Sequence, residues 1–296
     1  MHFCFIIEAR YRYDLMPLAV ARQLVAWGHN VDLLEPQTTL TCLSDLTQEK
    51  YDAYVLKTVS DGPGLSLLEA AEAAGIPTIN HSRSIRLVRD KAVATAYAYG
   101  LPIPLTYFAV HSELLKQIPT EHYPLVVKPT NGSSCRDLFL LDSPADLATW
   151  RLVETTARFF LAQHYVENRG LDSKLYVAGT EAFAVAKRSP LHPEVRVDKR
   201  LLPPTLELRN LALRVGRLFD LDIYGLDVVE TRDGPMVVDI NDFPSFRRVP
   251  HAVSLVSAEI LHIASRRLSR LNGLRSETSS EAINEVAVSF SYMVRE

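Results

Sequence analysis

Three oxygen-bearing side chains stand close together in the last third of this 296-residue chain. Asp227 lies in one apolar stretch, and Asp239 and Asn241 lie in the next, beyond the turn Thr-Arg-Asp-Gly at 231–234. The turn predicts a β-hairpin, and residues two apart on a strand point to one face. Carboxylate and amide oxygens around an open site suit Mg²⁺, which takes one or two carboxylates together with nucleotide phosphates. A surface hairpin with solvated acids is the alternative, because the apolar pattern alone does not bury this face.

A lysine within an apolar run is the second chemical signal. Lys128 follows the residues Pro-Leu-Val-Val, and the polar residues Asn-Gly-Ser-Ser come soon after it at 131–134. A lysine is costly to bury without a partner. The combination predicts a charge directed at phosphate groups beneath a loop of backbone N–H donors. An edge lysine whose ammonium reaches solvent is the alternative.

Further apolar stretches with basic ends follow. Residues 160–167 pass from an apolar strand into polar residues, and residues 174–179 and 184–188 predict a pair of strands. Lys187 and Arg188 are neighbours on the second strand of this pair, so only one of them can face a cleft.

The sequence patterns of the strands and helices that must position these side chains predict an α/β fold. The first ninety residues alternate between strand and helix patterns, which predicts a small parallel sheet. The expected strands of this region and of the C-terminus lie at 2–7, 31–34, 52–57 and 286–294. The expected helices lie at 15–27, 65–74, 90–99, 208–219 and 252–271. No glycine fingerprint follows the first strand, so dinucleotide binding is not supported.

The composition and net charge of the chain limit the classes of function that it can have. The chain is 47% hydrophobic and 23% charged, as is usual for a globular protein with room for two or three subdomains. A net charge of −3 predicts no general attraction to nucleic acid or membranes. Three scattered cysteines argue against disulfides or zinc and fit a reducing cytoplasm. The apolar start predicts a first strand rather than a signal peptide, and no apolar run reaches the length of a membrane span.

In this order the pieces resemble the ATP-grasp superfamily. Residues 80–91, followed by Gly-Leu-Pro-Ile-Pro at 100–104 and by Thr106, are similar to the opening segment of the ribosomal-protein glutamate ligases. The resemblance implies a small parallel α/β domain followed by two α+β subdomains that clamp ATP. The implied divisions are an N-terminal domain at 1–90, a central subdomain at 91–163, a C-terminal subdomain with the metal site at 164–272, and a polar linker with a terminal strand at 273–296.

The resemblance also implies roles for individual residues. Lys91 and Lys128 would be the two lysines that hold ATP phosphates, and Asp227, Asp239 and Asn241 would be the ligands of Mg²⁺, with Mn²⁺ as a possible substitute. The remaining nucleotide contacts would come from two segments. The phosphate loop would contribute Ser133 and Ser134, and the hinge that holds the adenine edge would contribute Gln163, His164, Tyr165 and Val166.

Two branches of the superfamily are open. The first, which we take as the main hypothesis, transfers the γ-phosphoryl of ATP to a hydroxyl of a phosphorylated polyol, as inositol trisphosphate 5/6-kinases do. The second, favoured by the opening segment, joins a carboxylate to an amine through an acyl phosphate. In the kinase hypothesis the catalytic residues would be Lys174, Arg188 and Lys128. The contacts to the acceptor would come from Lys57, Arg136, Lys174 and Ser245.

A third class, a nucleotide-binding regulator without turnover, is disfavoured because the phosphate lysines and the metal ligands occur together. The expected partners are ATP and a small anionic substrate, with no nucleic acid and no membrane, and the oligomeric state is open. Arg83, Arg86 and Arg89 recur three residues apart and predict a solvated helix face. Arg10 and Arg12 follow the first strand, where α/β sheets bind ligands, so they are candidates for the acceptor pocket.

Overall fold

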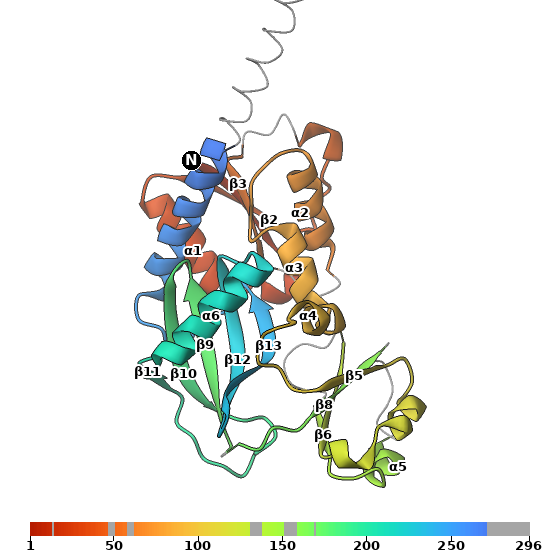
Figure 1. Cartoon of the computed structure of the whole chain (residues 1–296). Helices are drawn as coiled ribbons and strands as arrows, with labels where there is room; N and C mark the ends of the chain where they lie inside the picture. The colour runs from red at the N-terminus through yellow and green to blue at the C-terminus, as the bar shows by residue number, and fades with distance from the viewer. Residues whose placement is uncertain are drawn as a thin grey trace, which may run out of the picture.

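The computed structural model describes residues 1–13, 15–46, 51–57, 62–130, 138–150, 159–168 and 170–270. The described chain contains a four-stranded parallel sheet, a four-stranded antiparallel sheet and a five-stranded antiparallel sheet. Figure 1 shows the first and last of these packed beside each other, with the middle sheet standing apart at the lower right. The predicted α/β fold with an α+β clamp is confirmed.

The N-terminal sheet has the strand order β2-β1-β3-β4. Its two middle strands are buried almost throughout, as their continuous apolar runs predict for a parallel sheet. Helices α1 and α2 connect neighbouring strands, as the β/α alternation predicts. The elements of this unit are β1 (His2–Ile7), α1 (Leu15–Ala26), β2 (Asn30–Leu34), β3 (Ala53–Lys57), α2 (Pro63–Ala73) and β4 (Thr78–Ile79), with short 3-10 helices at Ala9–Tyr11 and Leu43–Asp45.

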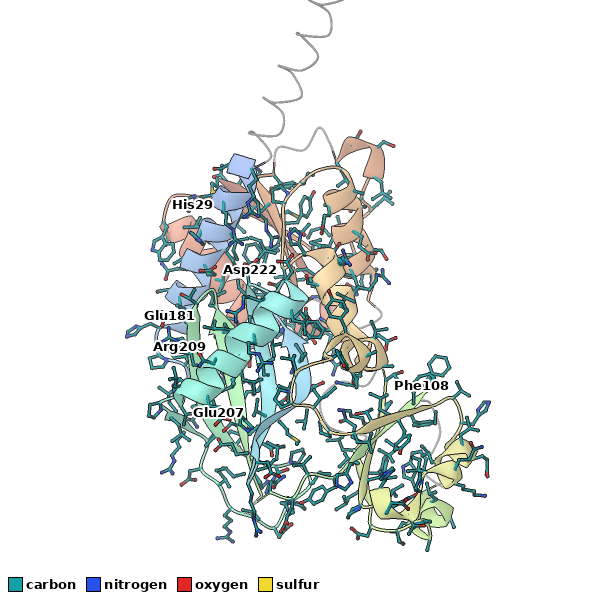
Figure 2. All side chains as sticks on the ribbon, viewed as in Figure 1. His29, Phe108, Glu181, Glu207, Arg209 and Asp222 are labelled. Atoms are coloured by element: carbon teal, nitrogen blue, oxygen red, sulfur yellow. The ribbon has the colours of Figure 1, made fainter. Side chains whose placement is uncertain are left out.

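The central sheet has the order β5-β8-β6-β7 and its own small core. Trp150 packs edge-on against Phe139 and Phe160 in that core. On the opposite edge, Figure 2 shows Phe108 projecting outward from β5. The elements are β5 (Thr106–Ala109), β6 (Leu125–Pro129), β7 (Phe139–Leu141), α5 (Asp146–Trp150) and β8 (Phe160–His164), with 3-10 helices at Ser112–Gln117 and Thr120–His122.

The C-terminal sheet has the order β11-β10-β9-β12-β13. Its elements are β9 (Leu171–Ala178), β10 (Glu181–Arg188), β11 (Arg200–Leu202), α6 (Leu206–Phe219), β12 (Ile223–Thr231) and β13 (Gly234–Asp242). Helix α6 begins at the cap Thr205, whose hydroxyl accepts a hydrogen bond from the Leu208 amide. It packs the predicted apolar face on the sheet, while Glu207 and Arg209 remain exposed, as Figure 2 shows.

One continuous core joins the N-terminal unit to the last helix of the described chain. The helix at residues 252–270 packs Val256 and Ile260 into the same cluster as Phe5 and Val20 of the N-terminal unit. That cluster also contains Tyr176 from the C-terminal sheet. The N-terminal unit and the C-terminal sheet are therefore held together by apolar packing, whereas the core of the central sheet is separate.

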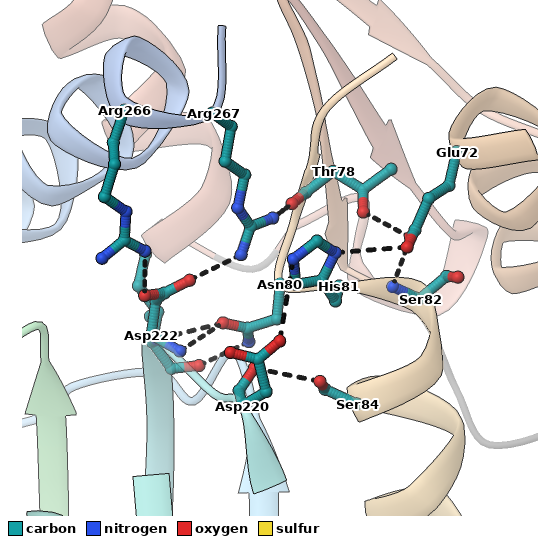
Figure 3. A network of polar contacts seen from close by, with 11 residues as sticks. Glu72, Thr78, Asn80, His81, Ser82, Ser84, Asp220, Asp222, Arg266 and Arg267 are labelled. Atoms are coloured by element: carbon teal, nitrogen blue, oxygen red, sulfur yellow. Dashed lines mark hydrogen bonds and ion pairs between the residues drawn. The ribbon is translucent and has the colours of Figure 1, made fainter. Parts of the chain in front are cut away.

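A polar network reinforces the same junction (Figure 3). The Asn80 side chain accepts hydrogen bonds from the amides of Asp222 and Ile223 and donates one to the Ile223 carbonyl. The Arg267 guanidinium contacts the Thr78 carbonyl and a carboxylate oxygen of Asp222. These contacts tie strand β4 and the C-terminal helix to the start of β12, the strand that carries Asp227.

Helices α3 (Ser82–Arg89) and α4 (Lys91–Tyr97) connect the N-terminal unit to the central sheet. Their apolar residues pack with the C-terminal sheet and α6. The prediction of a solvated arginine face on α3 is wrong for Arg89. Its guanidinium makes two contacts of 2.8 and 3.0 Å with the Asp242 carboxylate at the end of β13. Arg86 does form an exposed ion pair, with Glu69.

Several expectations lie outside the described residues. These are the linker and terminal strand at 273–296 and the phosphate-loop residues Ser133, Ser134 and Arg136. The predicted division of the chain at residues 90, 163 and 272 stays a prediction. Across the described part of the chain, the structure contains no helix with both the length and the apolar character needed to cross a bilayer.

Candidate functional site

The site is a cavity of about 120 Å³ lined by residues of the central sheet and of the C-terminal sheet. Its apolar walls include Val126 and Leu138 on one side and Val229 on the other. Its polar lining brings together cations and carboxylates that are far apart in sequence: Lys91, Lys128, Asp172, Lys187, Asp227 and Asp239. A cavity whose lining combines apolar side chains with several charged groups suits a ligand that has both an apolar ring and anionic groups.

The register of the β12–β13 hairpin brings the predicted metal ligands together. Asp227 pairs with Asp239 and Gly225 pairs with Asn241, with an irregularity after Asp227. The Asn241 amide nitrogen lies 3.5 Å from Asp239 Oδ2. Within the described chain no group of three His, Cys, Asp or Glu side chains is arranged to hold a metal. Asn241 supplies the third oxygen donor of the predicted set, and it does not line the cavity. Two carboxylates and an amide form a set of oxygen donors that fits Mg²⁺.

Lysines surround the two carboxylates. Lys174 Nζ lies 2.9 Å from Asp227 Oδ2, Lys187 Nζ lies 2.6 Å from Asp227 Oδ1, and Lys91 forms an ion pair with Asp239. Burial raises the pKa of Asp227, but the ammonium groups of Lys174 and Lys187 outweigh burial, so this pKa lies well below its ordinary value. For Asp239, burial is likewise outweighed by Lys91 and by Lys128, and the pKa is lowered. Both carboxylates are therefore ionised at neutral pH, as metal ligands must be.

The two predicted phosphate lysines enter the cavity from different elements. Lys91 is the first residue of α4, where the Asp90 carboxylate accepts hydrogen bonds from the amides of Ala92 and Val93. Lys128 is buried on β6 and donates a 2.9 Å hydrogen bond to the Val238 carbonyl of the opposite sheet. The structure thus brings both lysines to one end of the cavity, next to the acidic hairpin.

The predicted hinge also lines the cavity, with Gln163, His164, Tyr165 and Val166 in sequence order. The amide of His164 donates to the Leu105 carbonyl and the amide of Tyr165 donates to the Pro124 carbonyl. Recognition of an adenine edge by these two amides would require those bonds to break. If the hinge binds adenine, we expect it to use other backbone groups of the segment.

On strand β10 the structure places Lys187 in the cavity, and Arg188 points away from it. Arg188 is exposed and donates to the Pro193 carbonyl. The reason is register: Lys187 pairs with Asp172 and Val185 pairs with Lys174, so alternate residues of β10 share the face of Asp227. Of the three predicted catalytic residues, Lys128 lines the cavity, Lys174 contacts Asp227 without lining the cavity, and Arg188 lies outside the lining. Their catalytic roles stay predictions.

Of the predicted acceptor residues that the structure describes, Lys57, Lys174 and Ser245 do not line this cavity. Lys57 does not line it; its ammonium donates to the Phe243 carbonyl and lies 4.8 Å from the centroid of the Tyr11 ring. Ser245 is half-buried and follows β13, beside Tyr176. Arg12, a candidate for the acceptor pocket, forms an ion pair with Glu35 near the surface.

Asp172 and Ser189 are cavity residues that the sequence analysis missed. Asp172 is buried two residues before Lys174 on β9, and strand alternation could have placed it on the same face. Burial raises the pKa of its carboxyl, against the charge of Lys187. Ser189 is buried just beyond β10, where its amide donates to the Gly170 carbonyl, and no local pattern marks it.

Comparison with known proteins agrees with this geometry. Residues 80–262, more than half of the chain, match the RimK-like ATP-grasp domain family. The chain belongs to this family. The matched segment contains both phosphate lysines, the hinge and the acidic hairpin. The predicted membership of the ATP-grasp superfamily is thereby confirmed.

Curated relatives of this ATP-grasp chain carry ligase names. It is 23% identical over 291 residues to a probable alpha-L-glutamate ligase of Vibrio vulnificus, covering 90% of this chain and 95% of the relative. It is 26% identical over 206 residues to a probable alpha-L-glutamate ligase of Legionella pneumophila, covering 65% of this chain and 68% of the relative.

Solved structures show the same fold. A RimK domain ATP-grasp protein from Sphaerobacter thermophilus superposes with a TM-score of 0.69 at 19% identity, covering 88% of this chain and 99% of the other. A D-alanine–D-alanine ligase from Bacillus anthracis, solved with ATP, gives a TM-score of 0.64 at 14% identity and covers 91% and 99% of the two chains. At these identities the likeness supports the ATP-grasp fold of this chain.

Proposed function

We propose that this protein is an ATP-dependent carboxylate–amine ligase that uses L-glutamate as one substrate. The observation that carries the proposal is the family match over residues 80–262, which contain a cavity lined by two phosphate lysines and an acidic hairpin. The names of the curated relatives support glutamate as a substrate. Of the two activities considered from the sequence, this is the one implied by the opening segment at 80–106.

The contacts of Lys57 in the N-terminal unit favour the ligase over the kinase. The kinase hypothesis needs Lys57 to hold a phosphate of the acceptor. In the structure the Lys57 ammonium binds the Phe243 carbonyl and packs beside the Tyr11 ring, and Lys57 is not part of the cavity lining. A lysine engaged in this way ties two parts of the fold together and gives no support for a phosphorylated polyol as the acceptor.

In the proposed reaction the adenine ring lies between Val126 and Val229 and the phosphates lie beside Lys91 and Lys128. Asp227, Asp239 and Asn241 would hold Mg²⁺, or Mn²⁺ in its place, which when bound supplies positive charge at the β- and γ-phosphates. An oxygen of the acceptor carboxylate forms a bond to the γ-phosphorus, and the bond to the bridging oxygen breaks as ADP leaves.

The second half of the proposed reaction makes the amide. The nitrogen of the amine attacks the carbonyl carbon of the acyl phosphate, the nitrogen loses a proton, and inorganic phosphate leaves. Lys174, whose ammonium contacts Asp227, would neutralise oxygens of the transferring group in this proposal. The contribution of these lysines is charge stabilisation and orientation, which dominates catalysis of phosphoryl transfer.

The test is a substrate panel scored by ADP release and by product mass. Glutamate is supplied with short peptides and amino acids as carboxylate acceptors, and inositol phosphates are supplied in parallel. We expect ADP release only when a carboxylate and an amine are both present, with a product equal to their combined mass less one water. Release of ADP with an inositol phosphate alone, and a product heavier by one phosphoryl group, would replace the ligase with the kinase.

A further inference from the structure

Lys187 holds a position that neither sequence resemblance nor the proposed reaction requires. Its ammonium lies 2.6 Å from Asp227 Oδ1, while the Lys174 ammonium lies 2.9 Å from Asp227 Oδ2. Each oxygen of this carboxylate is therefore in contact with a lysine. A metal ion that binds an oxygen of Asp227 would lie beside an ammonium already in contact with that oxygen, and repulsion between the two cations favours displacement of the ammonium.

The two lysines differ in their freedom to move. Lys174 sits on β9 between two neighbouring strands, opposite Asp227 and Val185. Lys187 sits one residue from the end of β10 and lines the cavity, which Lys174 does not, although the two side chains are similarly buried. A lysine has a long, flexible stem that carries a compact charge, so its ammonium can move several ångströms without a change in the backbone.

The cavity offers Lys187 a second partner of the right charge. Lys187 lines the same cavity as Lys91 and Lys128, the two lysines assigned to the nucleotide phosphates. Asp172, directly opposite Lys187 in the sheet, is buried and also lines the cavity, so two carboxylates lie near the Lys187 side chain, those of Asp172 and Asp227. When a divalent cation binds Asp227, the attraction of that carboxylate for the ammonium weakens, and the phosphates of a bound nucleotide would then compete with Asp172 for the Lys187 ammonium.

We propose that Lys187 is an exchange lysine: it neutralises Asp227 while the site holds no metal, and it moves to the nucleotide phosphates when a divalent cation binds Asp227. The proposal rests on the nucleotide site of the proposed function and adds a phosphate-binding residue to it. Its consequence is energetic coupling. Metal binding releases Lys187 for the nucleotide, and nucleotide binding draws Lys187 away from the metal site, so each ligand strengthens the binding of the other.

Calorimetric titrations of the full chain test this coupling without turnover. Wild type, Lys187→Ala and Lys187→Met are titrated with Mg²⁺ alone, with the non-hydrolysable analogue AMPPNP alone, and with AMPPNP at saturating Mg²⁺. Both variants should bind Mg²⁺ alone about threefold or more tightly, because a competing ammonium is gone. Both should bind Mg²⁺–AMPPNP about ten- to hundredfold more weakly, because a charged contact to phosphate is lost.

The affinity for Mg²⁺ alone should rise while the affinity for Mg²⁺–AMPPNP falls, and a purely structural role of Lys187 would not change the two in opposite directions. Lys116→Ala is the matched control, since Lys116 is also paired with a carboxylate, that of Glu113, but is exposed and lies outside the cavity lining. It should leave both affinities at the wild-type value. Unchanged affinities in the Lys187 variants, or equal weakening of both ligands, would overturn the proposal.

The methionine variant keeps the packing of the lysine stem, so it reports on the charge if the alanine variant is poorly folded. A wild-type protein that binds neither Mg²⁺–AMPPNP nor AMPPNP would contradict the proposed function itself. A wild-type protein that binds the nucleotide while the Lys187 variants behave like it would contradict only the role of Lys187.

Discussion

Asp227 and Asp239 are directly opposite each other on the two strands of the β12–β13 hairpin. Like charges at paired positions of a sheet are destabilising, so the arrangement opposes folding on its own. Lys174 and Lys187 contact Asp227, and Lys91 contacts Asp239, which offsets the repulsion. A carboxylate pair that is stable only with surrounding cations is suited to exchange those cations for a metal ion and a nucleotide.

Replacement of one of these carboxylates should separate activity from stability. Asp239→Asn keeps the shape of the side chain but removes a charge that the metal site needs. We expect turnover to fall by about a hundredfold or more, while the free energy of unfolding changes by about 1 kcal/mol or less because repulsion with Asp227 is lost together with the Lys91 pair. Steady-state ADP release and urea unfolding measure the two effects.

The control for this variant lies on the same hairpin. Asp233 is exposed in the turn between β12 and β13, outside the cavity lining, so Asp233→Asn should alter neither activity nor stability. Wild-type turnover in Asp239→Asn at ordinary Mg²⁺ would remove Asp239 from the metal site.

Lys57 and Lys174 should give contrasting results. Lys57→Ala removes the contact to the Phe243 carbonyl, so the free energy of unfolding should fall by about 1–3 kcal/mol with little change in the KM of any substrate. Lys174→Ala removes a charge from the cleft face, so kcat should fall by about ten- to hundredfold. Urea unfolding and steady-state kinetics on both variants provide the comparison.

One kinetic result from the Lys57 and Lys174 variants would contradict a structural role of Lys57. A large rise in the KM of the acceptor for Lys57→Ala, without loss of stability, would show that Lys57 binds the acceptor. That result would return the phosphorylated polyol to first place among the acceptors.

The local periodicity of the sequence was sufficient to predict features that depend on a single helix or on one hairpin. Asp227, Asp239 and Asn241 were placed together from the turn and the two-residue spacing, and the apolar face of α6 followed from its helical period. The order of the motifs was enough to identify the superfamily. The parallel N-terminal sheet followed from the alternation of strands and helices.

Prediction failed where partners come from distant segments. Whether Lys187 or Arg188 enters the cavity depends on the register of β10 with β9, which neither strand specifies by itself. Arg89 looked solvated because its partner, Asp242, lies on a strand that follows it by some 150 residues. The acceptor role of Lys57 stays a prediction: it ends a parallel strand, where ligands often bind, and its ammonium contacts the Phe243 carbonyl just after β13.

The junction in Figure 3 gives a prediction on stability with an internal control. Arg267 is buried and bridges the Thr78 carbonyl and Asp222, whereas Arg266 contacts the same Asp222 carboxylate from a more exposed position. Arg267→Ala should lower the free energy of unfolding by about 3–5 kcal/mol, because it leaves buried polar groups without their hydrogen-bond partner. Arg266→Ala should lower it by about 1 kcal/mol or less.

Urea unfolding of the two arginine variants under one set of conditions makes the comparison. Equal losses in the two variants would mean that the bridge from Arg267 to strand β4 adds nothing to the stability of the junction.

Glu72 should make stability depend on pH in the acidic range. Its carboxylate accepts hydrogen bonds of 2.7 Å from the Thr78 hydroxyl and 2.8 Å from the Ser82 amide, and it contacts His81 at 3.2 Å. Burial raises the pKa of Glu72, but these hydrogen bonds outweigh burial and lower it from 4.5 to about 2. A depressed pKa in the folded state stabilises the fold above the unfolded value of 4.5, and this contribution is lost as the pH falls towards 2.

Glu72→Gln isolates that contribution. The difference in the free energy of unfolding between wild type and Glu72→Gln should be largest near pH 7 and should shrink as the pH is lowered from 4.5. Glu69→Gln is the matched control on the same helix, since Glu69 pairs with the exposed Arg86 and should contribute about 1 kcal/mol or less. Urea unfolding at stepped pH measures all three proteins. A Glu72 difference that stays constant from pH 7 down to pH 3, where its loss should already have begun, would show that the Glu72 carboxylate does not depend on these hydrogen bonds for its charge.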